Sequence, residues 1–324
     1  MKKSRVLVIG SLVMDLILRT DRFPERGETV TGIDFQAAPG GKGANQAVQC
    51  ARLGADVTMV GRVGADSFGQ ALLASLNGSG VETKHVLITD DCASAVGNVQ
   101  IEVTEQRTSN RIIVAPGANM RLTEGDIEFL RDEIEKYDIL ILQLEIPMEV
   151  NVVAAQIARE KGVLVMLNTA PYVPTPKELL ENVTFISPNE HEAALMTGIQ
   201  ITDERTAREA VQALREQGVD QVIITLGDKG AAYGNGERFF ISPCVKNVAV
   251  QDPTAAGDSF VGAFCTAVCA GVDVEQAMKF ANHTAALTVS RMGAQPSLPN
   301  IHEVMTYMES AGVDISDLRL LADD

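Results

Sequence analysis

The segment at residues 252–260, DPTAAGDSF, combines residue types that suit the handling of a transferring phosphate. Small residues precede an acid, and the apolar run 260–270 that follows has helical spacing. The main-chain amides of residues 255–258 would then lie at a helix N-terminus, where unpaired amides and the helix dipole attract an anion. An acid repels that anion unless it does chemistry, so we interpret Asp258 as a general base for an attacking hydroxyl. An aspartate that caps the first helical turn is the alternative interpretation.

A second glycine-rich segment, Gly40-Gly41-Lys42-Gly43-Ala44-Asn45-Gln46, follows an extended stretch and opens a helical pattern. It lacks the G-x-x-x-x-G-K-[ST] spacing of a Walker A loop, and Gln46 stands where a dinucleotide fingerprint has its third glycine. Backbone without side chains beside a lysine, an asparagine and a glutamine suits close contact with a polyhydroxyl ligand. A plain glycine-rich turn is the alternative.

Two further polar segments follow predicted strands. Residues 189–192, NEHE, come directly after Ser187-Pro188, where open α/β sheets bind ligands, and their acids would suit a hydrated Mg²⁺. Ordinary charge in the first turn of a helix is the alternative there. Residues 225–230, TLGDKG, have glycines that would let a nucleotide approach the backbone. Because all these polar segments fall at the carboxyl ends of predicted strands, they should line one crevice.

Short β-branched runs alternate with amphipathic helical patterns along most of the chain. The predicted strands are apolar at successive positions, as strands covered on both faces are; they are 6–9, 57–60, 139–142, 163–167, 185–186 and 222–225. The predicted helices are 44–53, 68–76, 150–161 and 207–217, and Gly54, Gly162 and Gly218 stand just past three of them as left-handed caps. This alternation predicts an α/β fold of three layers, a mostly parallel sheet with helices on both faces.

Two regions interrupt the alternation. Residues 29–38, and residues 95–103 with 111–114, have strand patterns with no helix between them. We expect a small antiparallel sheet that projects from the body as a lid or a dimerisation surface, built from segments of about 12–38 and 95–115. The chain has no linker-like composition, so we expect residues 1–324 to form a single domain.

The composition narrows the class of function. At 324 residues and 46% hydrophobic content, the chain suffices for a substantial core. A formal charge of -16 argues against a nucleic-acid partner, because that binding needs basic surface. Trp is absent and aromatic residues make up 4%, so a base-stacking platform is not expected. A phosphate ligand stays compatible with this charge, because main-chain amides bind one without basic side chains.

The cysteines and the N-terminus bear on location. The five cysteines form an odd set without a C-x-x-C pair, which favours a reducing compartment. Residues 1–14 superficially resemble a signal peptide, but Gly10 and Asp15 interrupt the apolar stretch and no cleavage site follows. No segment has the ~20 apolar residues that a membrane span needs. We therefore expect a cytoplasmic protein without a membrane partner.

Taken together, the two glycine-rich segments resemble, in order, the two motifs of the ribokinase-like carbohydrate kinase family, and the likeness runs from about Arg5 to the region of Pro299. Residues 143–145 (QLE), 168–171 (NTAP) and 293–297 (GAQPS) resemble that family too. The resemblance implies ATP-dependent transfer of the γ-phosphoryl group to the primary hydroxyl of a sugar, which gives ribose 5-phosphate if ribose is the substrate. It also implies a homodimer joined through the projecting sheets.

Roles for individual residues follow from this resemblance. It implies that Asp258 is the catalytic base and that the amides of Ala255, Ala256 and Gly257 hold the phosphoryl group. Sugar contacts would come from Val13, Asp15, Gly41, Lys42, Gly43, Asn45, Glu145 and Asp258. The ATP site would be lined by Asn189, Thr225, Gly227, Asp228, Gly230, Gly257 and Asn282. Glu190 and Glu192 would support Mg²⁺ through water. An activating monovalent cation, typically K⁺, would be held by oxygens of Asp252, Thr254, Thr288, Arg291, Gly293 and Ser297.

Two positions depart from the family pattern. Val13 stands where many members have an asparagine that binds the sugar, and the lost hydrogen bond is worth ~1–3 kcal/mol. A sugar that lacks the facing hydroxyl suffers no such loss, so 2-deoxyribose or a relaxed pentose specificity is the alternative to ribose. Pro253 replaces the more usual threonine after Asp252, which stiffens the loop and removes a donor.

Alternatives from other classes make different predictions. A non-catalytic sugar or nucleotide sensor of the same fold would have an eroded base or anion site, whereas Gly257 and Asp258 are both present. Adenosine is a less favoured substrate because few aromatic residues are available to hold a base. A sugar phosphate is disfavoured because no additional Arg or Lys cluster lies near these motifs.

Overall fold

A large sheet forms the centre of the molecule. The computed structural model describes residues 3–103 and 108–321. Its nine-stranded sheet has the order β13-β12-β11-β10-β9-β8-β1-β4-β5, and every pair is parallel except β11–β12 and β12–β13. The strands are β1 (Arg5–Ile9), β4 (Asp56–Gly64), β5 (Glu82–Thr89), β8 (Ile139–Leu142), β9 (Leu164–Asn168), β10 (Phe185–Ser187), β11 (Gln221–Thr225), β12 (Ala231–Gly234) and β13 (Phe239–Ser242).

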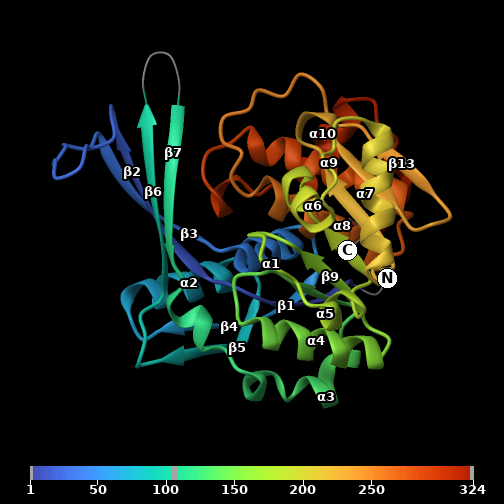
Figure 1. Ribbon diagram of the computed structural model, residues 1–324, viewed down its shortest axis with the longest axis horizontal. Coiled ribbons are helices and arrows are strands. Elements are labelled where there is room, and N and C mark those ends of the chain that lie inside the picture. The colour runs from blue at the N-terminus through green and yellow to red at the C-terminus, as the bar shows by residue number, and fades with distance from the viewer. Residues whose placement is uncertain (1–2, 104–107, 322–324) are drawn as a thin grey trace.

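Helices cover both faces of this sheet (Figure 1). They are α1 (Lys42–Arg52), α2 (Ser67–Gly78), α3 (Leu130–Glu133), α4 (Met148–Glu160), α5 (Lys177–Leu180), α6 (Glu190–Thr197), α7 (Glu204–Glu216), α8 (Ala256–Cys269), α9 (Val274–Val289) and α10 (Ile301–Ser310). Short 3₁₀ turns include η4 (Gly227–Lys229) and η5 (Gln295–Ser297). In the described residues, no helix is long and apolar enough to cross a membrane.

Two separate cores lie on the two sides of the sheet, because successive side chains of a strand point to opposite faces. In β1, Val6 and Val8 belong to the core under α1, α8 and α9, whereas Leu7 and Ile9 belong to the core under α4 and α7. Burial on both faces explains why these strands are apolar at every position. The predicted three-layer α/β fold is confirmed.

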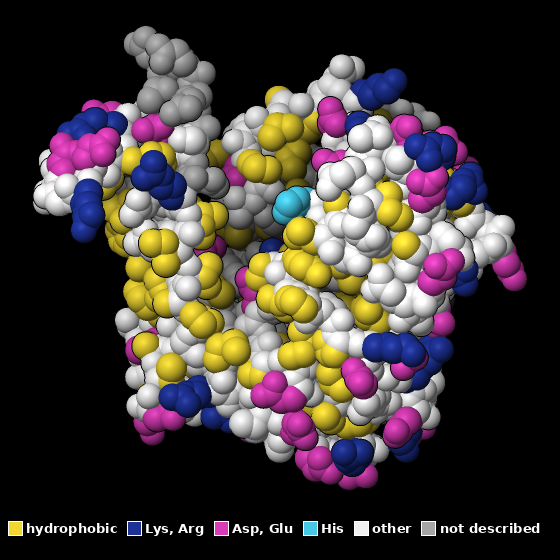
Figure 2. Space-filling view, viewed as in Figure 1, with side chains coloured by type: hydrophobic (Ala, Val, Ile, Leu, Met, Phe, Trp, Pro, Cys, Tyr) yellow, Lys and Arg dark blue, Asp and Glu magenta, His cyan; other side chains and the backbone are white. Residues whose placement is uncertain are grey.

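A second, smaller sheet projects from the body (Figure 1). Its order is β3-β2-β6-β7, with β2 (Val13–Thr20), β3 (Asp34–Gly40), β6 (Ala95–Val103) and β7 (Thr108–Ala115). The pairing is antiparallel at both edges, and the central pair β2–β6 is parallel. The expected domain covers residues 1–324, and one expected lid segment covers about 95–115. Within them, residues 1–2, 104–107 and 322–324 lie outside the described residues. Figure 2 shows the surface hollowed between this sheet and the body.

The structure shifts some predicted boundaries. The strand expected over 29–38 lies at Asp34–Gly40, because its partner β2 ends at Thr20 and pairs no further than Arg19 with Asp34. The helices begin earlier than their apolar patterns, because polar residues such as Asp66 and Asp203 accept hydrogen bonds from the first-turn amides. Gly54, Gly162 and Gly218 have φ of 95°, 72° and 111°, as caps in the left-handed region require.

Candidate active site

The N-terminus of α8 presents main-chain amides to solvent. Ala255 precedes the helix with a left-handed φ of 61°, and the Ala256 amide donates to the carbonyl oxygen of Pro253 at 3.3 Å. The amides of Ala255, Gly257 and Asp258, by contrast, donate no hydrogen bond to any of the described residues. Three of the four amides expected to face an anion are therefore available at the positive end of a 14-residue helix.

The carboxylate of Asp258 is held by two neighbouring residues of α1. Its Oδ2 accepts from Asn45 Nδ2 at 2.9 Å, and its Oδ1 accepts from Gln46 Nε2 at 3.0 Å. The side chain is 6% exposed and makes no capping bond to the first turn of α8. Capping therefore does not account for this aspartate, whereas fixed orientation of its carboxylate suits a base.

Helices α1 and α8 approach closely enough for these bonds because Gly262 has no side chain. A Cβ there would lie 2.9 Å from the Cβ of Gln49. On α1 itself, Gly43 packs against the end of β1, where an added Cβ would lie 2.6 Å from the amide nitrogen of Ser11. Gly41 precedes the helix with a φ of 91°. The glycines of this segment thus bring Lys42, Asn45 and Gln46 to the sheet edge.

Lys42 lies among four carboxylates. Burial lowers the pKa of its ammonium, but the charges of Asp258, Glu145, Glu192 and Asp15 outweigh burial and hold the pKa above its ordinary value. The ammonium therefore stays protonated in the ligand-free protein. It offers a fixed positive charge beside the base and the anion site.

Asp15 enters the site from the projecting sheet. It lies between Gly40 and Gly97, where an added Cβ on either would come within 2.4 Å of one of its carboxylate oxygens. Burial, with smaller effects from Glu145 and Asp258, raises the pKa of Asp15 to about 7, although Lys42 opposes the shift. Asp15 is thus a buried carboxyl group with a pKa near neutral, close enough to Glu145, Asp258 and Lys42 for their charges to act on it.

Glu145 fixes the start of α1 against the end of β1. Its Oε2 accepts from the Lys42 amide at 3.2 Å and from the hydroxyl of Ser11, which in turn accepts from the Gly43 amide at 3.3 Å. This small network brings together segments that are distant in the chain, since Lys42 and Glu145 are 103 residues apart. The sequence motifs identified Lys42, Gly43 and Glu145 but gave no role to Ser11.

Two cavities meet at the anion site. A cavity of ≈ 270 Å³ contains Asp258, Lys42 and Glu192, and a second of ≈ 370 Å³ contains Gly227, Gly230 and Asn282. Both are lined by the same four residues, Asn189, Thr225, Ala256 and Gly257. An anion bound at the α8 amides would thus lie between the base on one side and the second cavity on the other.

Hydrogen bonds hold one side of the second cavity in place. Asn282 of α9 donates to the Ser242 hydroxyl at 3.0 Å and to the Pro243 carbonyl at 3.1 Å, which anchors the helix to the end of β13. Asn189 pairs with Thr225 across two parallel strand ends. Asp228, expected here from the sequence, is exposed on η4 and is not among the residues that line either cavity.

The two glutamates assigned to Mg²⁺ face different cavities. Glu192 lines the cavity with Asp258, where its Oε2 accepts from Thr169 Oγ1 and from the Asn189 amide, both at 3.0 Å. That second bond completes a capping box with Asn189. Glu190 lines the other cavity. Glu192 thus caps α6 and also lines the cavity of Asp258.

The residues assigned to a monovalent cation lie on the loop before α8 (Asp252 and Thr254) and on the end of α9 with the loop that follows it through η5. Asp252 joins these loops, because its Oδ1 accepts from the Thr254 amide and its Oδ2 from the Gly293 amide, each at 2.9 Å. Ser297 is buried and donates to the Ala294 carbonyl at 2.7 Å. The Thr288 carbonyl accepts from the Arg291 amide at 3.1 Å. Carboxylate, hydroxyl and carbonyl oxygens without nitrogen or sulfur ligands form a donor set that fits a hard cation.

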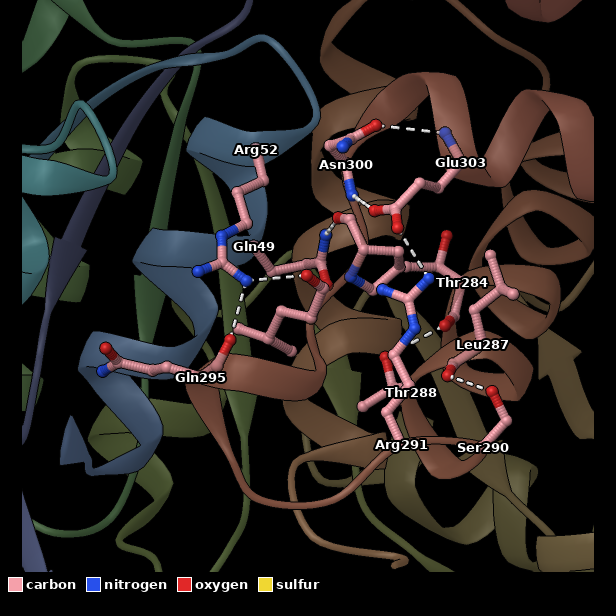
Figure 3. A network of polar contacts seen from close by, with 12 residues as sticks. Gln49, Arg52, Thr284, Leu287, Thr288, Ser290, Arg291, Gln295, Asn300 and Glu303 are labelled. Carbon is pink, nitrogen blue, oxygen red and sulfur yellow. Dashed lines mark hydrogen bonds and ion pairs between the residues drawn. The ribbon is translucent and has the colours of Figure 1, made fainter. Parts of the chain in front are cut away.

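A polar network holds the second of these loops in place (Figure 3). Arg52, at the far end of α1 from Lys42, donates to the carbonyl oxygens of Gln295 and Leu298 at 2.7 Å each. Arg291 pairs with Glu303 at 2.7 Å, and Glu303 in turn caps α10. Helix α1 therefore connects the base at one end with this loop at the other.

Sequence reasoning missed several residues of the cavities. Asn168, Ala170, Ser187 and Pro253 line the cavity of Asp258, and His191, Phe260 and Ala285 line the other. Positions at or just after strand ends, or within motifs already recognised, were the available signal for all of them except Ala285, which lies within α9. Which side chains of those stretches face the cavity depends on the twist and packing of the strands, which the sequence pattern does not specify.

Known proteins of similar sequence have been compared with this chain. The pfkB family carbohydrate kinase model matches residues 3–301. The ribokinase of Haemophilus influenzae is 37% identical over 311 residues, which cover 95% of this chain and 100% of that protein. The deoxyribokinase of Salmonella typhi is 34% identical over 307 residues, which cover 94% of this chain and 98% of that protein.

Solved structures agree with these relatives. The structure of Arabidopsis thaliana ribokinase complexed with ribose and ATP has a TM-score of 0.87 to this chain at 32% identity, and the match covers 95% of this chain and 99% of that one. The resemblance inferred from the two glycine-rich segments is thereby confirmed. The chain belongs to the pfkB family of carbohydrate kinases.

Proposed function

We propose that this protein transfers the γ-phosphoryl group of ATP to the 5-hydroxyl of D-ribose and so forms ribose 5-phosphate. The observation that carries the proposal is the position of Asp258 and the free α8 amides, where the two cavities meet. The likeness to a ribokinase solved with ribose and ATP supports it.

In this reaction Asp258 accepts the proton of the sugar hydroxyl as the hydroxyl oxygen forms its bond to the γ-phosphorus. The bond from the γ-phosphorus to the bridging oxygen breaks, and the electron pair leaves with ADP. The amides of Ala255, Gly257 and Asp258 stabilise the charge on the transferring group. Lys42 adds a positive charge on the side of the base.

The sugar would lie between the projecting sheet and the body. Asp15 and Glu145 offer carboxylate oxygens to its hydroxyls, and Asn45 offers an Oδ1 that is buried without a hydrogen-bond partner in the described chain. Gly41 and Gly43 let the start of α1 pack against residues 10–13, which brings Lys42 and Asn45 toward the sugar. An unpaired buried acceptor costs free energy, so a donating hydroxyl there would be favoured.

The nucleotide would occupy the second cavity, with its terminal phosphates at the α8 amides. Asn189, Thr225, Gly227, Gly230 and Asn282 line the cavity, and Glu190 and Glu192 would hold Mg²⁺ through water. The metal would neutralise phosphate charge. A bound K⁺ at the oxygens around Asp252 would add positive charge behind the anion site.

A second candidate substrate is 2-deoxyribose, which the position of Val13 favours. Val13 is 5% exposed at the start of β2, two residues before Asp15, and one of its methyl carbons would lie 3.7 Å from a Cβ on Gly97. The likeness to a deoxyribokinase at 34% identity also supports this candidate. Valine offers no hydrogen bond to a hydroxyl that faces it.

We expect Val13→Asn to raise the preference for ribose over 2-deoxyribose by about 5- to 100-fold, because a restored hydrogen bond is worth ~1–3 kcal/mol. The measurement is the ratio of kcat/KM for the two sugars, with Val13→Thr as an intermediate case. An unchanged ratio in the folded variant would mean that position 13 does not face the discriminating hydroxyl.

We also propose that the protein is a cytoplasmic homodimer joined through the projecting sheet. Register places Leu18, Phe35 and Ile113 on one face of this sheet, where they are 37%, 60% and 70% exposed. Figure 2 shows hydrophobic side chains gathered along it. Exposed apolar groups on adjacent strands are typical of an interaction surface. The five free cysteines suit a reducing compartment.

Ile113→Lys is expected to convert the dimer to a monomer, because it places a charge at the most exposed of the three apolar residues on this face. Light scattering after size exclusion measures the mass directly. Ile88→Lys, at another exposed isoleucine with 61% exposure on β5, is the matched control and should leave the mass unchanged. A wild-type protein of monomer mass at micromolar concentration would contradict the homodimer.

The proposed activity is tested by ATP-dependent phosphorylation of D-ribose, 2-deoxy-D-ribose, fructose and adenosine, with Mg²⁺ and with or without K⁺. The account predicts the highest kcat/KM for ribose. A preference for 2-deoxyribose would make Val13 the residue that sets specificity. Bound ATP without turnover of any sugar would overturn the kinase proposal and favour a sensor of the same fold.

A further inference from the structure

Two buried glutamines connect Asp258 to the centre of the sheet. Gln46 and Gln143 are both 0% exposed. Gln143 Nε2 donates to Gln46 Oε1 at 2.7 Å, and Gln46 Nε2 donates to Asp258 Oδ1 at 3.0 Å. The resemblance that the sequence shows assigns a role to Asn45 but none to either glutamine. Their contacts form a continuous line from the end of β8 to the base.

The surroundings fix which end of each amide faces its neighbour. Gln46 Nε2 also points to Asn168 Oδ1 at 3.4 Å, and Asn168 has its own amide group engaged, because Nδ2 donates to the Ser187 carbonyl at 2.9 Å. If the Gln46 amide were reversed, its oxygen would face both that Oδ1 and the carboxylate. Only one orientation of Gln46 therefore avoids contacts between acceptors.

Gln143 is itself held in place. Its main-chain carbonyl accepts from Asn151 Nδ2 at 2.8 Å, and its side chain occupies the space that Gly10 leaves, where an added Cβ would lie 1.9 Å from Gln143 Oε1. That Oε1 has no hydrogen-bond partner in the described residues. A buried, unpaired oxygen costs free energy, which indicates that the donating end of Gln143 is kept toward Gln46.

We propose that Gln143 and Gln46 form a buried amide pair that positions the Asp258 carboxylate and keeps an N–H donor against it. The pair acts through Asp258 and does not touch substrate, so both glutamines are positioning residues. The inference rests on the proposed role of Asp258 as the base. With Asn45 on the other oxygen, each carboxylate oxygen keeps one lone pair for the proton of the sugar hydroxyl.

Other charged groups lie near Asp258: Lys42 and Asp15 interact with it, and Glu145 and Glu192 interact with Lys42. Lys42 lies on α1, Asp15 on the projecting sheet, Glu145 after β8 and Glu192 on α6. All of these groups remain in place when Gln46 is changed. Measuring kcat of the wild type and the variants over the same pH range therefore separates the effect of the amide pair from the effect of these charges.

The main test is Gln46→Glu, which keeps the shape of the side chain but places a second carboxylate beside Asp258. Two adjacent carboxylates repel each other, so the pair keeps one proton to a higher pH than a single carboxylate beside an amide would. We expect the acid limb of the kcat profile to move up by about one pH unit or more, so that kcat falls most on the acid side of the profile. The KM for the sugar should change less than about threefold, because sugar contacts remain.

Gln143→Glu tests the pair from a residue that does not touch Asp258. An ionised carboxylate at position 143 places an acceptor against Gln46 Oε1 in place of the donor, so the Gln46 amide is no longer fixed with its N–H group toward the base. The acid limb should move in the same direction as in Gln46→Glu. The matched control is Gln49→Glu, one turn further along α1, where the side chain is equally buried and donates to the Pro299 carbonyl at 2.9 Å. Its acid limb should stay in place.

If the charged variants do not fold, Gln46→Met tests the same inference. It removes the donor without adding charge, and kcat should fall by about tenfold at constant sugar KM. A folded Gln46→Glu or Gln46→Met with wild-type kcat and an unmoved acid limb would overturn the inference. An infrared difference titration of wild type against Asp258→Asn reports ionisation of Asp258 without turnover. It therefore tests the amide pair even if no sugar is phosphorylated and the proposed function fails.

Discussion

Asp258→Asn is expected to lower kcat by at least ~10²-fold while sugar binding is largely retained. Asparagine has nearly the same shape and can still accept one hydrogen bond from Asn45 or Gln46, but it cannot take the proton of the attacking hydroxyl. Steady-state kinetics give kcat, and calorimetric titration with ribose gives the affinity. The α8 amides remain, so a residual rate above the uncatalysed reaction is expected.

Asp132→Asn is the control for this variant, since Asp132 is exposed on α3 and the structure shows no side-chain bond to it within the described residues. Its kcat and its sugar affinity should equal those of the wild type. Unchanged turnover in Asp258→Asn would remove Asp258 from the role of base. A loss of sugar affinity as large as the loss of kcat would instead make it a binding residue.

Asp15→Asn is expected to raise the KM for the sugar by about 10- to 100-fold with a smaller change in kcat, because a charged acceptor of a sugar hydroxyl is lost. In the wild type, this KM should fall as the pH rises through about 7, since the pKa of Asp15 is raised to about 7 and its ionised form is the better acceptor. Measuring KM between pH 6 and pH 8 in both proteins checks this, and the variant should lack the pH dependence.

The same substitution should stabilise the ligand-free protein at alkaline pH. The pKa of Asp15 is raised from 3.8 to about 7 on folding, chiefly by burial, so the carboxyl group binds its proton more tightly in the folded state. The stability it contributes is fully present below pH 3.8 and is lost as the pH rises through about 7. Asp15→Asn removes this loss, which amounts to about 4 kcal/mol near pH 8.

Thermal melts of wild type and Asp15→Asn at about pH 5.5 and pH 8.5 measure this effect. The variant should have the higher Tm at the alkaline pH, and the difference should shrink toward the acid. A variant that is less stable at both values would show that Asp15 is held by favourable contacts in the folded state. A KM that is unchanged would show separately that Asp15 does not bind the sugar.

Much of the fold was predictable because local pattern and tertiary structure agree in the parallel sheet. The predicted strand 139–142 has the bounds of β8, and residues 6–9 lie within β1, because buried strands of a doubly covered sheet are apolar throughout. Strands β12 and β13 were missed, since they lie at the antiparallel edge of the sheet, outside the alternation of strands and helices. The interrupting glycines around them gave a turn signal rather than a strand signal.

The motifs for the site were predictable, whereas the contacts between them were not. Spacing placed Asp258 at a helix N-terminus and Asn45 on a helix, but only packing of α1 on α8 shows that Asn45 and Gln46 both donate to Asp258. The short-range pattern likewise gave Ser11 no role, because its partner Glu145 is 134 residues away in the chain. Buried polar contacts between distant segments need the tertiary structure to be seen.

The measurement that tests the central claim most directly is the identity of the product formed from ribose and ATP. Phosphorus–proton coupling in NMR spectra identifies which carbon carries the new phosphate, in parallel reactions with wild type and Asp258→Asn. The account predicts stoichiometric ADP and ribose 5-phosphate with the wild type, and formation at least ~10²-fold slower with the variant. Phosphate at another carbon, or equal rates in the two proteins, would contradict the assignment of the 5-hydroxyl as nucleophile and Asp258 as its base.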